Sequence, residues 1–220
     1  IPLHSVEDPA ELPWGERKVD IVFECTGFYT KEPDLRRHLE AGARRVILSA
    51  PAKSESIETV VHGVNRPEGA PELISCASCT TNCIAPVVEV MDRRFGVEKA
   101  VMTTVHAYTS SQEVVDGPAK KVRRGRAAAM NFVPTTTGAA VATTKTLPHL
   151  QGKFDGVAIR GPVAVGSLAD IVFLVRQAVT VDQVQATFRE EAATERYRDV
   201  LGASDEPLVS SDIIGDPRGS

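Results

Sequence analysis

The chain has 220 residues, of which 42% are hydrophobic and 25% charged, enough to bury a sizeable core in one large or two modest domains. Its formal net charge of −4 argues against a general nucleic-acid-binding protein. No apolar run approaches the roughly 20 residues that a membrane-spanning helix needs. The composition therefore predicts a protein that binds neither nucleic acid nor membrane.

The first part of the chain predicts alternating strands and helices. Apolar segments at residues 19–24, 45–49 and 73–76 are typical of short strands, and an amphipathic helix begins near Pro33 and stops at Gly42. A strand, a helix and a second strand in this order pair in parallel and suit a nucleotide-binding sheet. We therefore predict an α/β fold, with a nucleotide-binding domain over residues 1–78 and a mixed α+β catalytic domain over residues 79–220.

The second part of the chain predicts longer elements. Strands are expected at residues 99–108, 154–160 and 168–176, and helices at residues 78–95 and 138–147. A further helix starts after Thr180, whose spacing to Gln183 is that of a capping box, and runs to about residue 193. Residues 109–131 are polar, basic and aperiodic, and a loop of this length inside a compact domain is usually functional.

Three of the four cysteines fall within eight residues, at Cys76, Cys79 and Cys83, with Cys25 apart from them. Disulfide frameworks usually join distant segments, so this clustering predicts a reduced chain in the cytoplasm. A structural zinc site is not expected, because no second Cys-x-x-Cys or His pair follows Cys76 and Cys79.

Cys79 is the candidate nucleophile. It falls in the first turn of the predicted helix, between hydroxyl side chains, and the N–H groups and dipole of a helix start lower a thiol pKa. The alternative is a small buried hydrophobe, against which the polar neighbours argue. His106, near the end of a predicted strand, is the candidate base, and a hydrogen-bonded structural histidine is its alternative.

Several elements are suited to anions. Thr137 and Gly138 end a threonine-rich loop and open a predicted helix, whose N–H groups and hydroxyls would cradle a phosphate. Arg124 lies in the preceding polar loop and Arg160 ends a predicted strand, and an arginine fork matches phosphate oxygens. Together with the thiol and the histidine, these elements suit a phosphorylated aldehyde as substrate.

The motif Ala77–Cys83 (ASCTTNC), followed 27 residues after Cys79 by His106, resembles the glyceraldehyde-3-phosphate dehydrogenase family. Further matching stretches include residues 24–30, 103–109, 124–129 and 134–140. The resemblance implies a partial Rossmann-type NAD(P)-binding domain before the catalytic domain. It also implies NAD or NADP as cofactor, glyceraldehyde 3-phosphate and inorganic phosphate as substrates, and a homotetramer.

The resemblance assigns a role to each candidate residue. Cys79 matches the nucleophile and His106 its activating base. The remaining roles are the inorganic-phosphate site (Ser78, Thr80, Thr137 and Gly138), the substrate-phosphate site (Thr109 and Arg160), a further phosphate arginine (Arg124) and the cofactor cleft (Thr26, Gly27 and Ser49). The loop after Tyr108 resembles an S-shaped loop that packs against a neighbouring subunit.

The sequence departs from the family pattern at Cys76, Ser111, Val141 and Gly161, none of which removes a catalytic group. Ile1 in place of methionine suggests an internal fragment, and the resemblance puts the cofactor-binding glycine fingerprint before it. The preference for NAD or NADP therefore stays open. An erythrose-4-phosphate dehydrogenase-like sibling and a non-enzymatic redox-sensing thiol protein remain as alternatives.

Overall fold

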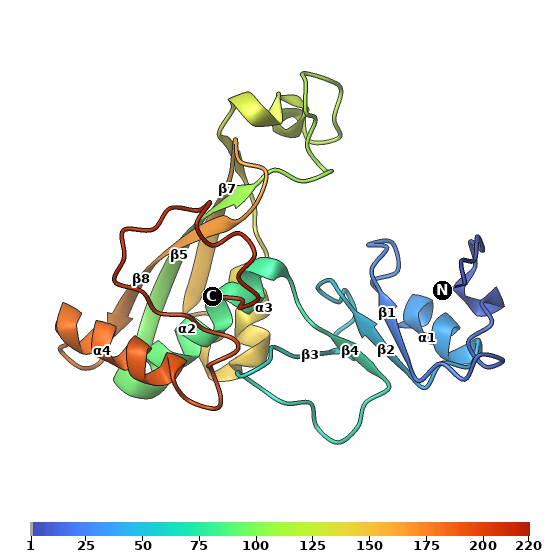
Figure 1. Ribbon diagram of the computed structural model, residues 1–220, viewed down its shortest axis with the longest axis horizontal. Helices are drawn as coiled ribbons and strands as arrows, with labels where there is room; N and C mark the ends of the chain where they lie inside the picture. Colours follow the sequence, from blue (N-terminus) through green and yellow to red (C-terminus); the bar gives the residue numbers. More distant parts are fainter. Residues whose placement is uncertain (1) are drawn as a thin grey trace. The chain divides into compact units, whose positions relative to one another are not determined.

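The computed structural model describes residues 2–220 and divides into two compact units (Figure 1). The first unit ends at Asn82 and the second runs from Cys83 to Ser220. Helix α2, Cys79–Phe95, begins in the first unit and continues through the second. Both units combine helices with strands, which confirms the mixed α/β class.

The first unit is built on a parallel sheet of strand order β1-β2-β4-β3. Its strands are β1 (Ile21–Glu24), β2 (Arg45–Leu48), β3 (Glu58–Thr59) and β4 (Leu73–Ser75), with a 3₁₀ helix η1 (Pro9–Glu11) and helix α1 (Glu32–Glu40). The predicted parallel strand–helix–strand unit is confirmed by β1, α1 and β2. Strand β3 was not predicted, because two polar residues carry no apolar pattern.

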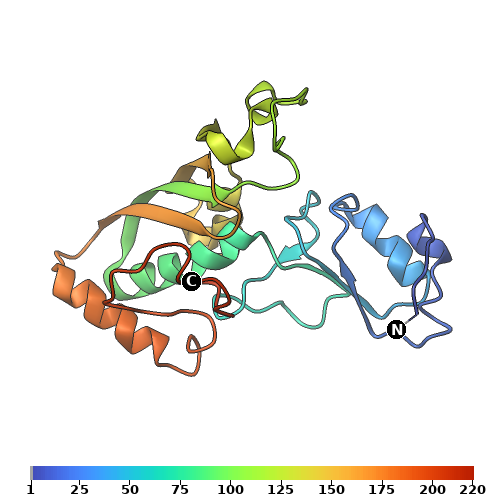
Figure 2. The same ribbon diagram turned by 45° about the horizontal axis from the view of Figure 1, so that its top comes forward.

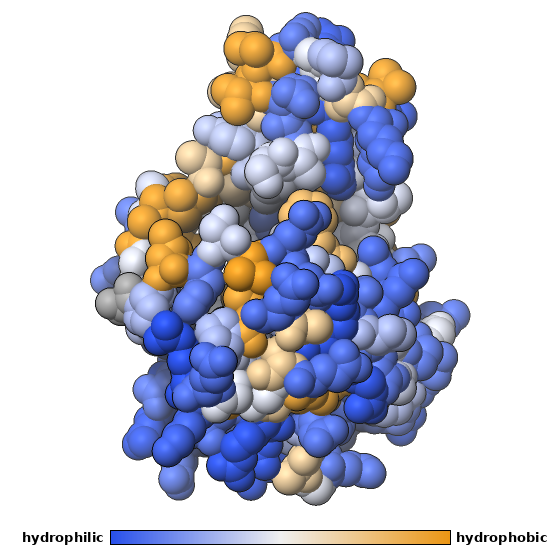
Figure 3. All heavy atoms as spheres, turned by 90° about the vertical axis from the view of Figure 1, so that its right-hand side faces the viewer, coloured by the Kyte–Doolittle hydropathy of each residue, from blue (hydrophilic) through white to orange (hydrophobic). Residues whose placement is uncertain are grey.

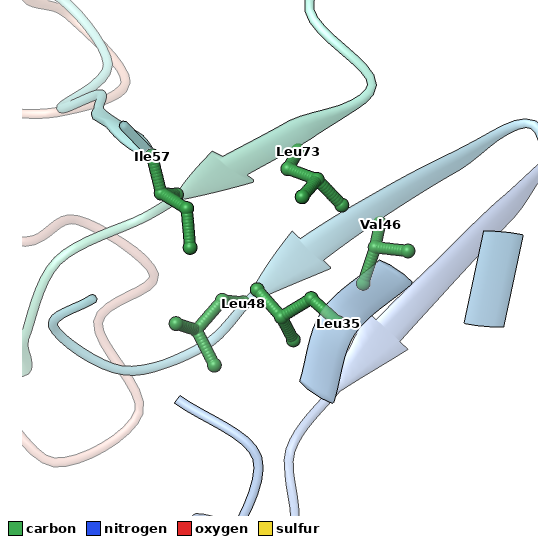
Figure 4. Close-up of a cluster of buried hydrophobic side chains, with 5 residues drawn as sticks. All are labelled: Leu35, Val46, Leu48, Ile57 and Leu73. Carbon is green, nitrogen blue, oxygen red and sulfur yellow. The ribbon is translucent and has the colours of Figure 1, made fainter. Parts of the chain in front are cut away.

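Helix α1 packs one face against this sheet. Leu35 on the helix and Val46 and Leu48 on β2 are fully buried, and Ile57 and Leu73 complete the cluster (Figure 4). Fully burying such a side chain contributes about 1.5–3 kcal/mol relative to leaving it exposed. This cluster therefore fixes α1 on the sheet.

The second unit contains a mixed sheet of strand order β6-β7-β5-β8. Its elements are β5 (Val97–Ala107), η2 (Val122–Gly125), η3 (Ala128–Met130), β6 (Val133–Thr135), α3 (Ala139–Thr146), η4 (Pro148–Leu150), β7 (Phe154–Gly161), β8 (Ser167–Val175) and α4 (Val181–Ala192). Strand β5 pairs in parallel with β7 and antiparallel with β8. The predicted helices and strands are confirmed here, including the Thr180–Gln183 capping box, while β6 was not predicted.

The two faces of this mixed sheet differ. Figures 1 and 2 show α2 and α3 on one side of it, where Ala100 and Met102 of β5 are buried. On the opposite face, exposed apolar side chains come from all three long strands: Val101, Val157, Leu168, Val172 and Leu174. Among residues 2–220, the structure has no helix that is both long and apolar enough to cross a membrane.

A charged network joins α2 to α4. Arg93 Nη2 lies 2.8 Å from Glu191 Oε2, and Arg93 Nε lies 2.9 Å from Glu89 Oε1. Arg94 Nη1 donates to Glu191 Oε1 at 2.9 Å, and the Tyr197 hydroxyl donates to Glu89 Oε2 at 2.5 Å. Glu191 is only 5% exposed, so its charge depends on these arginines.

The network predicts a loss of stability in acid. The hydrogen bond from Arg93 outweighs burial and holds the pKa of the Glu191 carboxyl below its usual range. A carboxylate with a lowered pKa in the folded state stabilises the fold above its unfolded pKa of about 4.3, and this stabilisation is lost as the pH falls through the lower folded pKa. Urea unfolding should show Glu191→Gln costing about 1–3 kcal/mol at pH 7.

The same substitution should cost less at pH 3, because below the unfolded pKa the unfolded wild-type chain binds a proton at this carboxyl and part of the stabilisation is lost. The control is Glu206→Gln, at an exposed position, which should leave the unfolding midpoint unchanged at both pH values. An equal cost for Glu191→Gln at pH 7 and pH 3 would contradict the linkage.

Candidate active site

The candidate residues of the first unit gather along one edge of its sheet. Because β1, β2 and β4 run in parallel, the segments that follow them emerge at the same edge. Thr26 and Gly27 follow β1, Ser49 follows β2, and Ser78 follows β4. Backbone hydrogen bonds tie these segments together, since Ser49 N–H donates to Glu24 O and Cys76 N–H donates to Leu48 O, both at 3.0 Å.

The turn after β1 is open to a ligand. Thr26 and Gly27 are exposed, and Gly27 has a φ of 76°, which favours glycine. A Cβ built on Gly27 would meet no atom within 4 Å, so space lies over the turn. An exposed glycine turn at the carboxyl edge of a parallel sheet is where such sheets bind nucleotides, so these residues fit a dinucleotide cofactor.

Strained backbone precedes α2. Ala77 is buried and has a φ of 61°, a conformation that costs a residue with a Cβ about 1–2 kcal/mol. Two polar side chains hold this turn. Ser75 Oγ accepts from Ala77 N–H at 3.1 Å, and Asn82 Nδ2 donates to Cys76 O at 2.7 Å and to Ser78 O at 2.9 Å. Neither of these side-chain roles follows from the sequence pattern.

Ser78 caps the helix that Cys79 begins. Its Oγ lies 3.1 Å from Thr81 N, the donor three residues along, which is the geometry of an N-cap. Cys79 is the first residue of α2 and is exposed, whereas Thr80 and Thr81 are buried. The alternative of Cys79 as a buried hydrophobe is therefore excluded. An exposed thiol at a helix start, where the helix dipole favours the thiolate, is suited to nucleophilic chemistry.

The other thiols have different surroundings. Burial raises the pKa of Cys76, and its Sγ donates to Leu48 O at 3.2 Å. Cys25 is exposed but lies in the turn after β1 rather than at a helix start. All four cysteines are present as thiols, and residues 2–220 hold no cluster of three or more side chains that could bind a metal ion.

In the second unit, strand register pairs His106 with Arg160. His106 on β5 is the parallel partner of Arg160 on β7. The Ala107 carbonyl O lies 2.7 Å from His106 Nδ1 and 2.8 Å from Arg160 Nη1. Because a carbonyl oxygen only accepts, Nδ1 carries the proton of the neutral ring. The 3.2 Å between Arg160 Nη1 and His106 Nδ1 is then a contact between two donors that share one acceptor.

This tautomer determines which nitrogen of the His106 imidazole has the lone pair. With the proton on Nδ1, the Nε2 atom of His106 is the one with a lone pair. Of the two ring nitrogens of His106, Nε2 is therefore the one that can accept a proton.

A second group of candidates clusters around Arg124. Its Nη1 donates to Ser111 Oγ and its Nη2 to Thr135 Oγ1, both at 3.1 Å, and Thr109 Oγ1 lies 3.0 Å from Ser111 Oγ. Thr137 Oγ1 accepts from Ala139 N–H at 3.1 Å, at the start of α3, and Gly138 is the N-cap residue of that helix. The second unit thus brings together Thr109 with Arg124, and separately His106 with Arg160.

Comparison with known proteins gives the family. The sequence-family model described as glyceraldehyde 3-phosphate dehydrogenase, C-terminal domain, matches residues 78–220. Curated relatives include glyceraldehyde-3-phosphate dehydrogenase 2 of Streptomyces avermitilis, 50% identical over 99% of this chain and 65% of its own length, and glyceraldehyde-3-phosphate dehydrogenase 1 of Bacillus subtilis, 48% identical over 100% of this chain and 66% of its own length.

The glyceraldehyde-3-phosphate dehydrogenase of Streptomyces coelicolor is also 50% identical, over 97% of this chain and 64% of its own length. The chain belongs to the glyceraldehyde-3-phosphate dehydrogenase family, as its ASCTTNC motif predicted. It spans about 65% of the length of the curated relatives it matches.

The geometry of the four thiols predicts their relative reactivity. In the native protein, iodoacetamide should alkylate Cys79 at least about tenfold faster than Cys76, because the thiolate is the reactive form and burial disfavours it at Cys76. Cys25 is the matched control, being exposed but away from a helix start, and should also react more slowly. Peptide mass spectrometry over time measures the rates. Equal labelling of Cys25 and Cys79 would argue against a nucleophile at Cys79.

Proposed function

We propose that the protein catalyses the phosphorylating oxidation of glyceraldehyde 3-phosphate to 1,3-bisphosphoglycerate, with NAD or NADP as cofactor. In this proposal residues 1–78 are the C-terminal part of a Rossmann-type NAD(P)-binding domain, and residues 79–220 are the catalytic domain. The observation that carries the proposal is the start of α2. In a chain of this family, the exposed Cys79 is the first residue of a helix that follows the left-handed Ala77.

Cys79 is the nucleophile in this proposal. Its thiolate forms a bond from Sγ to the aldehyde carbon, and the carbonyl π electrons move to oxygen, giving a hemithioacetal. The N–H of Cys79 lies at the first position of α2, where the helix dipole favours negative charge and therefore suits the developing oxyanion. The exposure of the side chain leaves access for the substrate.

His106 is the acid–base residue. Its Nε2 takes the thiol proton, and the resulting imidazolium donates to the oxyanion. The same atom later removes the proton of the hemithioacetal hydroxyl, so that a C=O bond re-forms as a thioester of Cys79. Support comes from Ala107 O, which holds the Nδ1 proton and keeps Nε2 as the basic atom.

Two anion sites complete the proposal. Thr109 and Arg160 would bind the phosphate of the aldehyde, with Arg124 joined to Thr109 through Ser111. Inorganic phosphate, which attacks the thioester carbon and releases the Cys79 thiolate, would bind Ser78, Thr80, Thr137 and Gly138. The starts of α2 and α3 support this assignment, since the positive end of a helix dipole favours anions.

The cofactor would lie on the carboxyl edge of the parallel sheet, held by Thr26, Gly27 and Ser49. When bound, its nicotinamide accepts the hydride that leaves the substrate carbon. The open space over Gly27 supports this placement. A cytoplasmic location is proposed from the four thiols, which a reducing compartment preserves.

A homotetramer is proposed from the surfaces of the second unit. The apolar outer face of the mixed sheet carries Val101, Val157 and Val172, whose exposed fractions are 59%, 57% and 69%. Apolar residues also gather over the loop that follows β5, where Val114, Val115, Val122 and Met130 are exposed (Figure 3). Exposed apolar patches of this kind are typical of subunit interfaces.

The reaction itself tests the proposal. The native protein should form NADH or NADPH from glyceraldehyde 3-phosphate at a rate that depends on inorganic phosphate or arsenate. Arg160→Ala should raise the KM for the aldehyde about tenfold or more, as expected when a charged hydrogen bond is lost. Thr137→Ala should mainly raise the concentration of phosphate needed. Arg123→Ala, in an exposed part of the loop, is the control. A rate that ignores phosphate and arsenate would refute a phosphorylating reaction.

His106→Asn isolates the role of Nε2. The shorter amide can still donate to Ala107 O, as Nδ1 does, but it has no group in place of Nε2. Turnover should therefore fall by about two to four orders of magnitude, the usual range for a lost acid–base group. Steady-state kinetics measure the change, with His62→Asn as the exposed control. Unchanged turnover would make His106 a structural residue.

A further inference from the structure

A buried carboxylate lies directly behind the proposed cofactor turn. Glu24 is the last residue of β1, and its side chain is only 3% exposed. Its Oε1 accepts the backbone N–H of Thr26 at 2.7 Å and also the Thr26 hydroxyl. The same hydroxyl oxygen accepts from Phe28 N–H at 3.2 Å. One carboxylate oxygen thus fixes the turn that contains Thr26 and Gly27.

The other carboxylate oxygen is held by a histidine. Glu24 Oε2 lies 3.0 Å from His38 Nε2, and His38 is 4% exposed on the inner face of α1. Trp14 Nε1 lies 3.1 Å from His38 Nδ1. An indole N–H only donates, so His38 Nδ1 accepts, and the ring proton is on Nε2, directed at Glu24. Trp14 therefore selects the tautomer that donates to the carboxylate.

Glycine contacts hold Trp14 in place. Gly15 N–H donates to Ala41 O at 2.9 Å, and a Cβ built on Gly42 would lie 2.5 Å from Gly15 Cα. With a φ of 103°, Gly42 also adopts a conformation that favours glycine. The segment with Trp14 is thus docked on the end of α1, beside the helix that carries His38.

We infer that Glu24 is a positioning residue for the cofactor, and that Trp14 and His38 hold it with both oxygens as acceptors. This inference rests on the proposed function, which puts Thr26 and Gly27 in the cofactor cleft. All three groups around the carboxylate are donors: His38 Nε2–H, Thr26 N–H and the Thr26 hydroxyl. Only a side chain that accepts through both oxygens satisfies them.

The tautomer of His38 can be tested with a double variant. In Glu24→Gln, the amide NH₂ must face either Thr26 or His38, and in both places it meets a donor. His38 could accept from the amide only by moving its proton to Nδ1, where it would oppose the Trp14 indole N–H. Trp14→Phe removes that indole N–H, so the second substitution should relieve the first.

The experiment measures binding of NAD and NADP to the native protein by fluorescence titration. Glu24→Gln should raise the dissociation constant about tenfold, the size expected for an unsatisfied buried group. Trp14→Phe should raise it only about twofold, and the double variant should return to within about threefold of wild type. Glu72→Gln, at a 65% exposed carboxylate, is the matched control and should bind as wild type does.

Hydrogen exchange provides a readout without cofactor. In the cofactor-free wild-type protein, the Thr26 amide should exchange at least about tenfold more slowly than an unprotected amide, because it donates to Glu24. Glu24→Gln should speed this exchange, and adding Trp14→Phe should slow it again. An unprotected Thr26 amide in wild type would overturn the inference even if the variants failed to fold.

The two proposals fail differently. A wild-type protein that binds neither NAD nor NADP would refute the proposed function. A wild-type protein that binds a cofactor, together with a Glu24→Gln variant that binds it equally well, would overturn the role of Glu24 alone. A double variant that binds cofactor no more tightly than Glu24→Gln would exclude the proposed effect of Trp14 on Glu24 through the His38 tautomer.

Discussion

The parallel pairing of β1, β2 and β4 is the constraint on which the candidate site of the first unit depends. Parallel strands deliver their following segments to one edge. Here that edge receives the Thr26–Gly27 turn, Ser49, and the segment that leads into α2. The pairing is made possible by the buried cluster of Leu35, Val46, Leu48, Ile57 and Leu73, because α1 must cover the sheet for the strands to be joined in the same direction.

Each candidate group is positioned by hydrogen bonds from neighbouring residues that have no proposed chemical role. Ser75 and Asn82 keep Ala77 in its left-handed conformation and so set where α2 begins. The Ala107 carbonyl determines which nitrogen of His106 carries the proton. Glu24 accepts the Thr26 N–H and so holds the turn that contains Thr26 and Gly27. In all three cases a hydrogen bond to a buried side chain or a backbone group fixes the local geometry.

In the second unit, the placement of the candidate residues depends on the register between β5 and β7, whereas in the first unit it depends on the parallel direction of the strands. The one-to-one alignment of β5 with β7 puts His106 beside Arg160, although 54 residues separate them in sequence. A shift by one residue would turn one of the two side chains to the other face of the sheet. The ion pairs of Arg93 and Arg94 with Glu191 join α4 to α2, the helix whose first residue is Cys79.

The sequence by itself determined the elements with strong periodicity, the capping box at Thr180 and the family motif around Cys79, because these signals are local. It did not predict β3 and β6, which have two and three residues and take their strand conformation from their neighbours. Nor did it predict the tautomers of His38 and His106, or the roles of Glu24, Asn82 and Trp14. Each of these depends on which donor meets which acceptor, and for Trp14, Glu24 and His38 the partners come from separate elements. Only the tertiary structure decides which of these groups are hydrogen-bonded to each other.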